Sequence, residues 1–151
     1  MIKLNRIGNK LGLAHQAGNL ASVCMFQGKH EEALAHVDES LQAYRELGDL
    51  ASAGQYLGTR GAILLDMGRW EEAMQTLKEA ITAQHRGGYE GSRGELRDLA
   101  NLVYAQFKCG APEARARAAE LLPRLLDPPP RVDFTDEGLE AQILRLKEVL
   151  T

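Results

Sequence analysis

Residues 28–34 read Gly-Lys-His-Glu-Glu-Ala-Leu, and residues 68–74 read Gly-Arg-Trp-Glu-Glu-Ala-Met. The two stretches begin 40 residues apart, and the same shift aligns further glycine, acidic and apolar positions on either side of them. Val23, for example, falls on Ile63. An internal repeat of this length is typical of proteins built from stacked supersecondary units.

Each copy of the repeat reads as two helices. In the second copy, apolar and small residues recur at spacings of three and four between residues 57 and 65. This pattern predicts an amphipathic helix that stops at Gly68, where glycine favours a left-handed cap. The next predicted helix starts near Trp70 and ends at residues 87–88. Two glutamates in its first turn suit the positive end of the helix dipole.

Glycines inside the first of these helices indicate close packing. Gly54, Gly58 and Gly61 lie within it, and each glycine in a helix interior costs about 1 kcal/mol relative to alanine. We therefore expect a neighbouring helix to approach closely at two of these three positions.

Composition limits the fold class and the kind of ligand. The chain has 151 residues, with 23 Leu and 20 Ala against 15 Val, Ile and Thr together. This bias favours helix over sheet, and the length fits one domain. The net charge is −3 with acidic and basic residues interspersed, so no nucleic-acid footprint is visible. No apolar run is long enough for a membrane span, and the N-terminus does not resemble a signal peptide.

Repeat boundaries predict the order of the helices. A third, more divergent copy follows at a shift of 42, and residues 4–9 align with the end of the first copy. We expect a partial helix at 1–8, left over from a longer array, and helix pairs at about 10–48, 50–88 and 94–127. Residues 128–151 are predicted to form a proline linker and a capping helix. That helix is expected over 135–150, with Thr135 as its N-cap and one apolar stripe that covers the end of the stack.

Several of these residues resemble the tetratricopeptide repeat family. The resemblance rests on Gly28 and Gly68 at the turns, on His30 and Trp70 after them, and on the Glu-Glu-Ala that follows in both copies. It covers about residues 1–127. The period of 40 is longer than the usual ~34 and is similar to the variety in bacterial signal-transduction regulators and kinesin light chains.

The resemblance implies an all-α, right-handed superhelix of antiparallel helix pairs. Its concave face, built by the first helix of each pair, would bind an extended peptide or a partner helix. The positions carried over to this face in the present sequence are His15, Asn19, Ser22, Phe26, Gln55, Thr59, Asp66, Arg97, Asn101, Tyr104, Phe107 and Lys108.

Some of these positions have alternative interpretations. Members that grip the C-terminal carboxylate of chaperones use lysine and asparagine where this chain has Gly18 and Ser22, so a chaperone-tail clamp is not predicted. Arg97 with Asn101 would suit an acidic group. Residues 104 and 107 are aromatic neighbours on a helix, and both face either the groove or the capping helix.

The sequence as a whole predicts a non-catalytic protein-interaction module of a bacterial regulatory or scaffold protein. The two cysteines lack metal-ligand spacing, which favours a reducing cytoplasm and predicts neither metal nor cofactor. One alternative is self-association through an apolar edge at the N-terminal end of the stack. Another is an enzyme or small-molecule sensor that uses Arg97, His15 and Tyr104, although no acid–base pair or nucleophile is visible.

Overall fold

The computed structural model describes residues 2–127 and 139–151, with side chains from Gly8 onward in the first range. Within these ranges the chain forms seven helices and no strand, which confirms the predicted all-α fold. They are α1 (Ile2–Phe26), α2 (His30–Glu46), α3 (Leu50–Asp66), α4 (Trp70–Arg86), α5 (Arg93–Lys108), α6 (Ala114–Leu126) and α7 (Glu140–Leu150).

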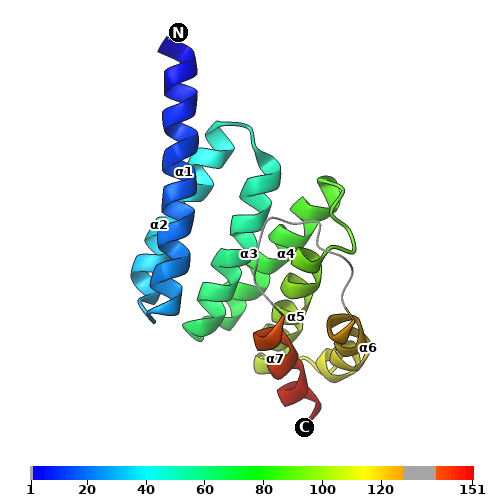
Figure 1. Cartoon of the computed structure of the whole chain (residues 1–151). Helices are drawn as coiled ribbons and strands as arrows, with labels where there is room; N and C mark the ends of the chain where they lie inside the picture. The colour runs from blue at the N-terminus through cyan, green and yellow to red at the C-terminus, as the bar shows by residue number, and fades with distance from the viewer. Residues whose placement is uncertain (1, 128–138) are drawn as a thin grey trace.

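The helices stack in sequence order. Helices α1 and α2, α3 and α4, and α5 and α6 form adjacent pairs, and each pair lies against the next (Figure 1). Helix α7 packs against both α5 and α6 at the C-terminal end. Because α1 has 25 residues and α2 has 17, the first turns of α1 extend beyond the rest of the stack (Figure 1).

Glycine ends each of the first five helices in the same way. At the end of α2, the Gly48 N–H donates to the Arg45 carbonyl and the Asp49 N–H donates to the Tyr44 carbonyl. This is a Schellman motif, which satisfies the last carbonyls of the helix and needs a positive φ at the glycine. The same arrangement with φ between 73° and 81° is present at Gly28, Gly48, Gly68, Gly88 and Gly110.

Helix starts are stabilised in two ways. Asp49 and Ser92 cap α3 and α5, because each side chain accepts a hydrogen bond from the backbone N–H three residues later. Helices α2 and α4 have no side-chain cap, but each carries two glutamates in its first turn, where the helix dipole favours negative charge.

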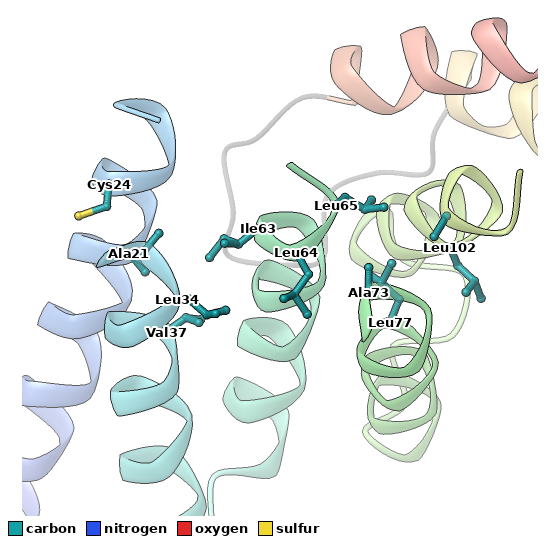
Figure 2. Close-up of a cluster of buried hydrophobic side chains, with 12 residues drawn as sticks. Ala21, Cys24, Leu34, Val37, Ile63, Leu64, Leu65, Ala73, Leu77 and Leu102 are labelled. Atoms are coloured by element: carbon teal, nitrogen blue, oxygen red, sulfur yellow. The ribbon is translucent and has the colours of Figure 1, made fainter. Parts of the chain in front are cut away.

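Buried apolar side chains run through the whole stack. One cluster joins α1 to α5, with Val37, Ile63 and Leu77 fully buried in its middle (Figure 2). A second cluster joins α5, α6 and α7, and a third lies between the other ends of α1 to α4. Tyr104 packs against the first and second clusters, and Tyr56 packs against the first and third. The core is therefore continuous from pair to pair.

Glycine allows the closest helix approaches, as the sequence predicted. A Cβ added at Gly61 would lie 2.6 Å from Leu77 Cγ of α4, and one at Gly58 would lie 2.6 Å from Asp98 Oδ1 of α5. Gly54 is also tight, with Ala83 Cβ at 3.0 Å. All three positions thus have a close neighbour, where two were expected.

The predicted partial helix at 1–8 is wrong as a separate element. Gly8 and Asn9 lie inside α1, which is continuous from Ile2 to Phe26. Gly8 is exposed and lacks the positive φ of the capping glycines. Its sequence resembles a turn, but the Schellman geometry that stops the other helices is absent here, so the helix continues.

The final helix begins later than predicted. Its expected start at residue 135 and the N-cap Thr135 lie outside the described residues, and α7 begins at Glu140. Leu139 precedes it with non-helical backbone angles and follows a glycine in the sequence, a residue that disfavours helix interiors. The predicted apolar stripe is confirmed, because Leu139 and Leu146 are buried in the cluster shared with α5 and α6.

A pair of glycine substitutions tests the close packing. Gly61→Ala should lower the free energy of unfolding by about 1–2 kcal/mol, because overpacking against buried Leu77 outweighs the gain in helix propensity. Gly12→Ala is the matched control, since Gly12 is also helical but has no atom within 4 Å of an added Cβ. It should raise stability by up to about 1 kcal/mol. Urea denaturation measures both, and equal effects would contradict the packing at Gly61.

Candidate functional site

A hollow of about 360 Å³ lies between the ends of α1 and α3, the start of α5 and the start of α7. Helices α1, α3 and α5 are the first helices of their pairs, so the hollow lies on the face predicted to be concave. Its lining consists of Met25, Phe26, Thr59, Ala62, Asp66, Arg97, Glu140, Ala141, Gln142 and Arg145.

Helix periodicity explains one wall of the hollow. Thr59, Ala62 and Asp66 lie three and four residues apart on α3 and therefore share one face. The opposite faces of α3 are buried against α2 and α4. Met25 and Phe26 come from the last turn of α1, and Phe26 is 84% exposed. This side of the hollow is therefore mostly apolar, and its polar groups are the Thr59 hydroxyl and the Asp66 carboxylate.

Helix α7 reaches across the hollow through Arg145. Its Nη2 donates to Asp66 Oδ1 at 2.8 Å, and its Nη1 donates to Asn101 Oδ1 at 2.6 Å. The guanidinium carbon lies 5.6 Å from the centre of the Tyr104 ring, within the range of a cation–π contact. One side chain thus joins α7 to both α3 and α5.

An aromatic and cationic cluster lies beside Arg145. The Trp70 and Tyr104 rings meet edge to face at 6.2 Å, and Phe107 lies 6.4 Å from Tyr104. Lys108 Nζ lies between 5.3 and 5.9 Å from the centres of these three rings and 3.8 Å from Glu148 of α7. Tyr104 and Phe107 pack in the cluster that includes α7, which answers the question that the sequence left open.

A buried polar cluster lies behind the hollow. Arg97 Nε is 3.2 Å from Asp98 Oδ1, and Gln84 Nε2 of α4 donates to Asp98 Oδ2. Burial raises the pKa of Asp98 to about 6, although Arg97 and Gln84 lower it in part and Glu95 raises it further. His85 Nε2 lies 2.5 Å from Glu95 Oε2. The charge of Arg97 is therefore matched by its neighbouring carboxylate.

The structure brings only part of the predicted site together. Phe26, Thr59, Asp66 and Arg97 line the hollow, although Arg97 is buried. Asn101 is fully buried, with its Nδ2 lacking a hydrogen-bond partner among the described residues. It lies next to Arg145 rather than on an open surface. Four predicted residues therefore meet at the hollow. Four others, Asn101, Tyr104, Phe107 and Lys108, lie on α5 next to α7 and do not line it.

The remaining four predicted residues lie elsewhere. His15 is exposed, and its Nδ1 is hydrogen-bonded to the Tyr44 hydroxyl at 2.8 Å. Asn19 is exposed on α1, and Ser22 donates to the Gly18 carbonyl at 3.3 Å. Gln55 lines a different cavity of about 10 Å³, which has only Arg97 in common with the lining of the hollow. Their use by a partner stays a prediction.

Sequence reasoning missed the residues that α7 contributes. Glu140, Ala141, Gln142 and Arg145 belong to no copy of the repeat, so no alignment of the copies placed them. The signal that could have located Arg145 is the apolar stripe of α7. If that stripe packs on the end of the stack, Arg145, which precedes Leu146 in the sequence, lies at the edge of the packed face.

In residues 2–127 and 139–151, no three histidine, cysteine or acidic side chains group as they would around a metal ion. No helix in the same part of the chain is both long and apolar enough to cross a membrane.

Comparison with known protein families matches residues 13–84 to the tetratricopeptide repeat. The match begins in the middle of α1, includes all of α2 and α3, and ends two residues before the end of α4. No curated protein matches the chain. The resemblance inferred from the repeated turns is thus confirmed for the first two helix pairs.

The Arg145–Asp66 ion pair should contribute measurably to the docking of α7. A double-mutant cycle with Arg145→Ala and Asp66→Ala should give a coupling energy of about 1 kcal/mol, because both side chains are mostly shielded from solvent. The longer and more exposed Lys108–Glu148 pair is the control and should give less than about 0.5 kcal/mol. Equal coupling in the two cycles, measured by urea denaturation, would contradict this role.

Asp98 should make stability depend on pH. An acid whose pKa is raised on folding binds more protons in the folded state, so its contribution to stability falls as pH rises through the range from 3.8 to about 6. Relative to Asp98→Asn, the wild type should lose up to about 3 kcal/mol of unfolding free energy between pH 4 and pH 7. The exposed Glu113→Gln serves as control, and a difference that stays constant with pH would refute the burial effect.

Proposed function

Because residues 13–84 are tetratricopeptide repeats, we propose that the hollow between α1, α3, α5 and α7 binds a peptide or helix of a protein partner. Repeats of this family generally mediate protein–protein interaction and are typically non-catalytic. The observation that carries the proposal for this particular surface is the exposed Phe26 ring at the mouth of a hollow with an apolar wall.

The apolar wall supports a side-chain anchor as the main contact. Met25, Phe26 and Ala62 line one side of the hollow, and aromatic residues are enriched among the side chains that dominate binding energy at interfaces. A partner that inserted one large apolar side chain there would remove the Phe26 ring from water. The hollow, at about 360 Å³, is at the small end of the range for binding pockets.

The polar groups around the hollow favour hydrogen-bond donors or a basic group on the partner. Glu140 is an exposed carboxylate at its rim, whereas the charge of Asp66 is compensated by Arg145. Arg97 is buried beside Asp98, which compensates its charge. An acidic ligand on Arg97 and Asn101 therefore has less support than an apolar anchor flanked by backbone N–H groups or a cationic side chain.

Asn101 gives a second reason to expect a polar backbone in the hollow. Its Oδ1 accepts from Arg145, but its Nδ2 is buried without a partner among the described residues. A buried donor left unpaired costs about 1–3 kcal/mol. Asn101 does not itself line the hollow, so a peptide carbonyl would reach this donor only if Arg145, which does line it, moved aside.

We further propose that the groove serves a cytoplasmic regulator or scaffold of a bacterium. The period of 40 residues supports this context through its similarity to the repeats of such regulators. Both cysteines are free thiols, and Cys109 is exposed, which suits a reducing compartment.

A sensor or enzyme built on Arg97, His15 and Tyr104 has less support. His15 is bound to Tyr44 of α2, whereas Arg97 is paired with its neighbour Asp98. The Tyr104 ring contacts Trp70 and the guanidinium of Arg145. Catalytic groups must converge on one reacting atom, and these three side chains have different surroundings.

Phe26→Ala tests the proposed groove. Peptides of random sequence displayed on phage and selected on the wild-type chain supply the ligands, and fluorescence polarisation measures their affinity for purified variants. Selected peptides should share an apolar anchor and bind Phe26→Ala at least about tenfold more weakly, a loss of about 1.4 kcal/mol. Leu50→Ala is the matched control, because Leu50 is a similarly exposed apolar residue at the opposite end of α3.

Two results would contradict peptide binding in the hollow. Peptides whose affinity is the same for the wild type and Phe26→Ala bind elsewhere. Peptides without an apolar residue, bound through acidic groups, would instead support the Arg97 and Asn101 interpretation. Circular dichroism at the same concentration shows whether each variant keeps the helical fold.

A further inference from the structure

Exposed apolar side chains gather on one helix. Of the eight large apolar residues exposed in the described part of the chain, five belong to α1. Leu13, Leu20 and Val23, which are 58%, 40% and 50% exposed, lie within one side of that helix because they are seven and three residues apart. Phe26 lies three residues beyond Val23, next to one end of this stripe, whereas the side of α1 that packs on α2 is buried.

The repeat shows what kind of element fits this stripe. A shift of 40 residues maps Leu13 and Val23 onto Ala53 and Ile63 of α3, which are buried. Between them, Tyr56 stacks on Tyr44 of α2 at 5.5 Å, and Arg60 Nε donates to Asp38 of α2 at 2.7 Å. The corresponding side of α3 is thus covered by the helix that precedes it.

The third pair repeats the same relationship. A shift of 42 from α3 leads to Asp98 and Leu102 of α5, which contact α4 through Gln84 and through the shared core around Leu77. In both cases the covering helix runs antiparallel to the helix that it covers. The open stripe of α1 therefore has the form of a surface for one antiparallel helix.

We propose that this helix is α1 of a second copy, packed antiparallel across a two-fold axis. A two-fold contact is self-complementary and closes on itself. Head-to-tail stacking of copies would need the outer face of α6, but α7 already covers it with Leu146 and Val149. A two-fold pair uses the open stripe of both copies and needs no other surface of the chain.

Charge along α1 favours the antiparallel direction. Residues 2–10 contain three basic residues and no acidic one, and residues 11–28 contain neither Lys, Arg, Asp nor Glu. Glu31 and Glu32, both exposed, begin α2 at the far end of α1. An antiparallel partner brings its basic end towards these glutamates, whereas a parallel one would bring like charges together. The uncharged middle allows Leu13 to meet Val23 of the partner.

Sedimentation velocity on the whole chain tests the association. From about 1 μM to about 1 mM, the weight-average mass should rise from the monomer value of 16.6 kDa towards twice that value. Leu20→Glu should raise the dissociation constant at least about tenfold, because it places a charge on the stripe of both copies. Leu144→Glu is the matched control, since Leu144 is exposed on α7, away from the stripe. Both variants should keep wild-type helicity by circular dichroism.

Cross-linking tests the direction of the pair. Chains with Leu13→Cys and differently tagged chains with Val23→Cys, both in a Cys24→Ala and Cys109→Ala background, are mixed and oxidised. An antiparallel pair should form mixed disulfides in excess over disulfides between identical chains.

Three outcomes would overturn the proposal. The first is a wild type that stays monomeric over the whole concentration range. The second is a dimer whose dissociation constant is unchanged by Leu20→Glu. The third is a cross-linking experiment in which identical chains form disulfides in preference to mixed ones. Peptide binding in the groove provides an independent measurement, because Leu20 lies outside the hollow. Unchanged peptide affinity in Leu20→Glu together with lost association would separate the two surfaces.

Discussion

The contact between Gly61 and Leu77 sets the distance on which the stack depends. Without a side chain on Gly61, α4 comes so close to α3 that an added Cβ would lie 2.6 Å from Leu77. Gly58 does the same for α5 through Asp98. Because α3 is held so closely on these two sides, its remaining face, with Thr59 and Ala62, is left to line the hollow. The same small residues that allow packing thus also determine which side of α3 is available to a ligand.

The two ends of the stack are treated differently. At the C-terminal end, α7 buries Leu146 and Val149 against α5 and α6. Its next exposed edge carries Arg145, which crosses to Asp66. The helix that covers the core therefore also forms one wall of the hollow. At the other end of the described chain, the apolar stripe of α1 is exposed to solvent. Only the C-terminal end of the stack therefore has a helix that covers its apolar surface.

Much of the fold follows from the repeat, because the capping glycines and the helix periodicity are local signals. Thr59 and Asp66 of α3, predicted for the concave face from the alignment of the copies, line the hollow. The position of Arg145 was not predictable, because α7 has no counterpart in the repeat. Asn101 corresponds to Thr59 in sequence but is buried, since α7 rather than a further helix pair covers α5. Gly8 resembled a capping glycine only because sequence does not show whether a turn forms.

The two interfaces between consecutive pairs use different chemistry at one position. Where α2 meets α3, the rings of Tyr44 and Tyr56 stack at 5.5 Å. Shifts of 40 and 42 residues map these rings onto Gln84 and Asp98, which are hydrogen-bonded where α4 meets α5. Packing α2 against α5 instead would deprive buried Asp98 of the Gln84 amide, and a buried carboxylate without donors is strongly unfavourable. The helix pairs thus stack in one order because a polar contact distinguishes the second interface from the first.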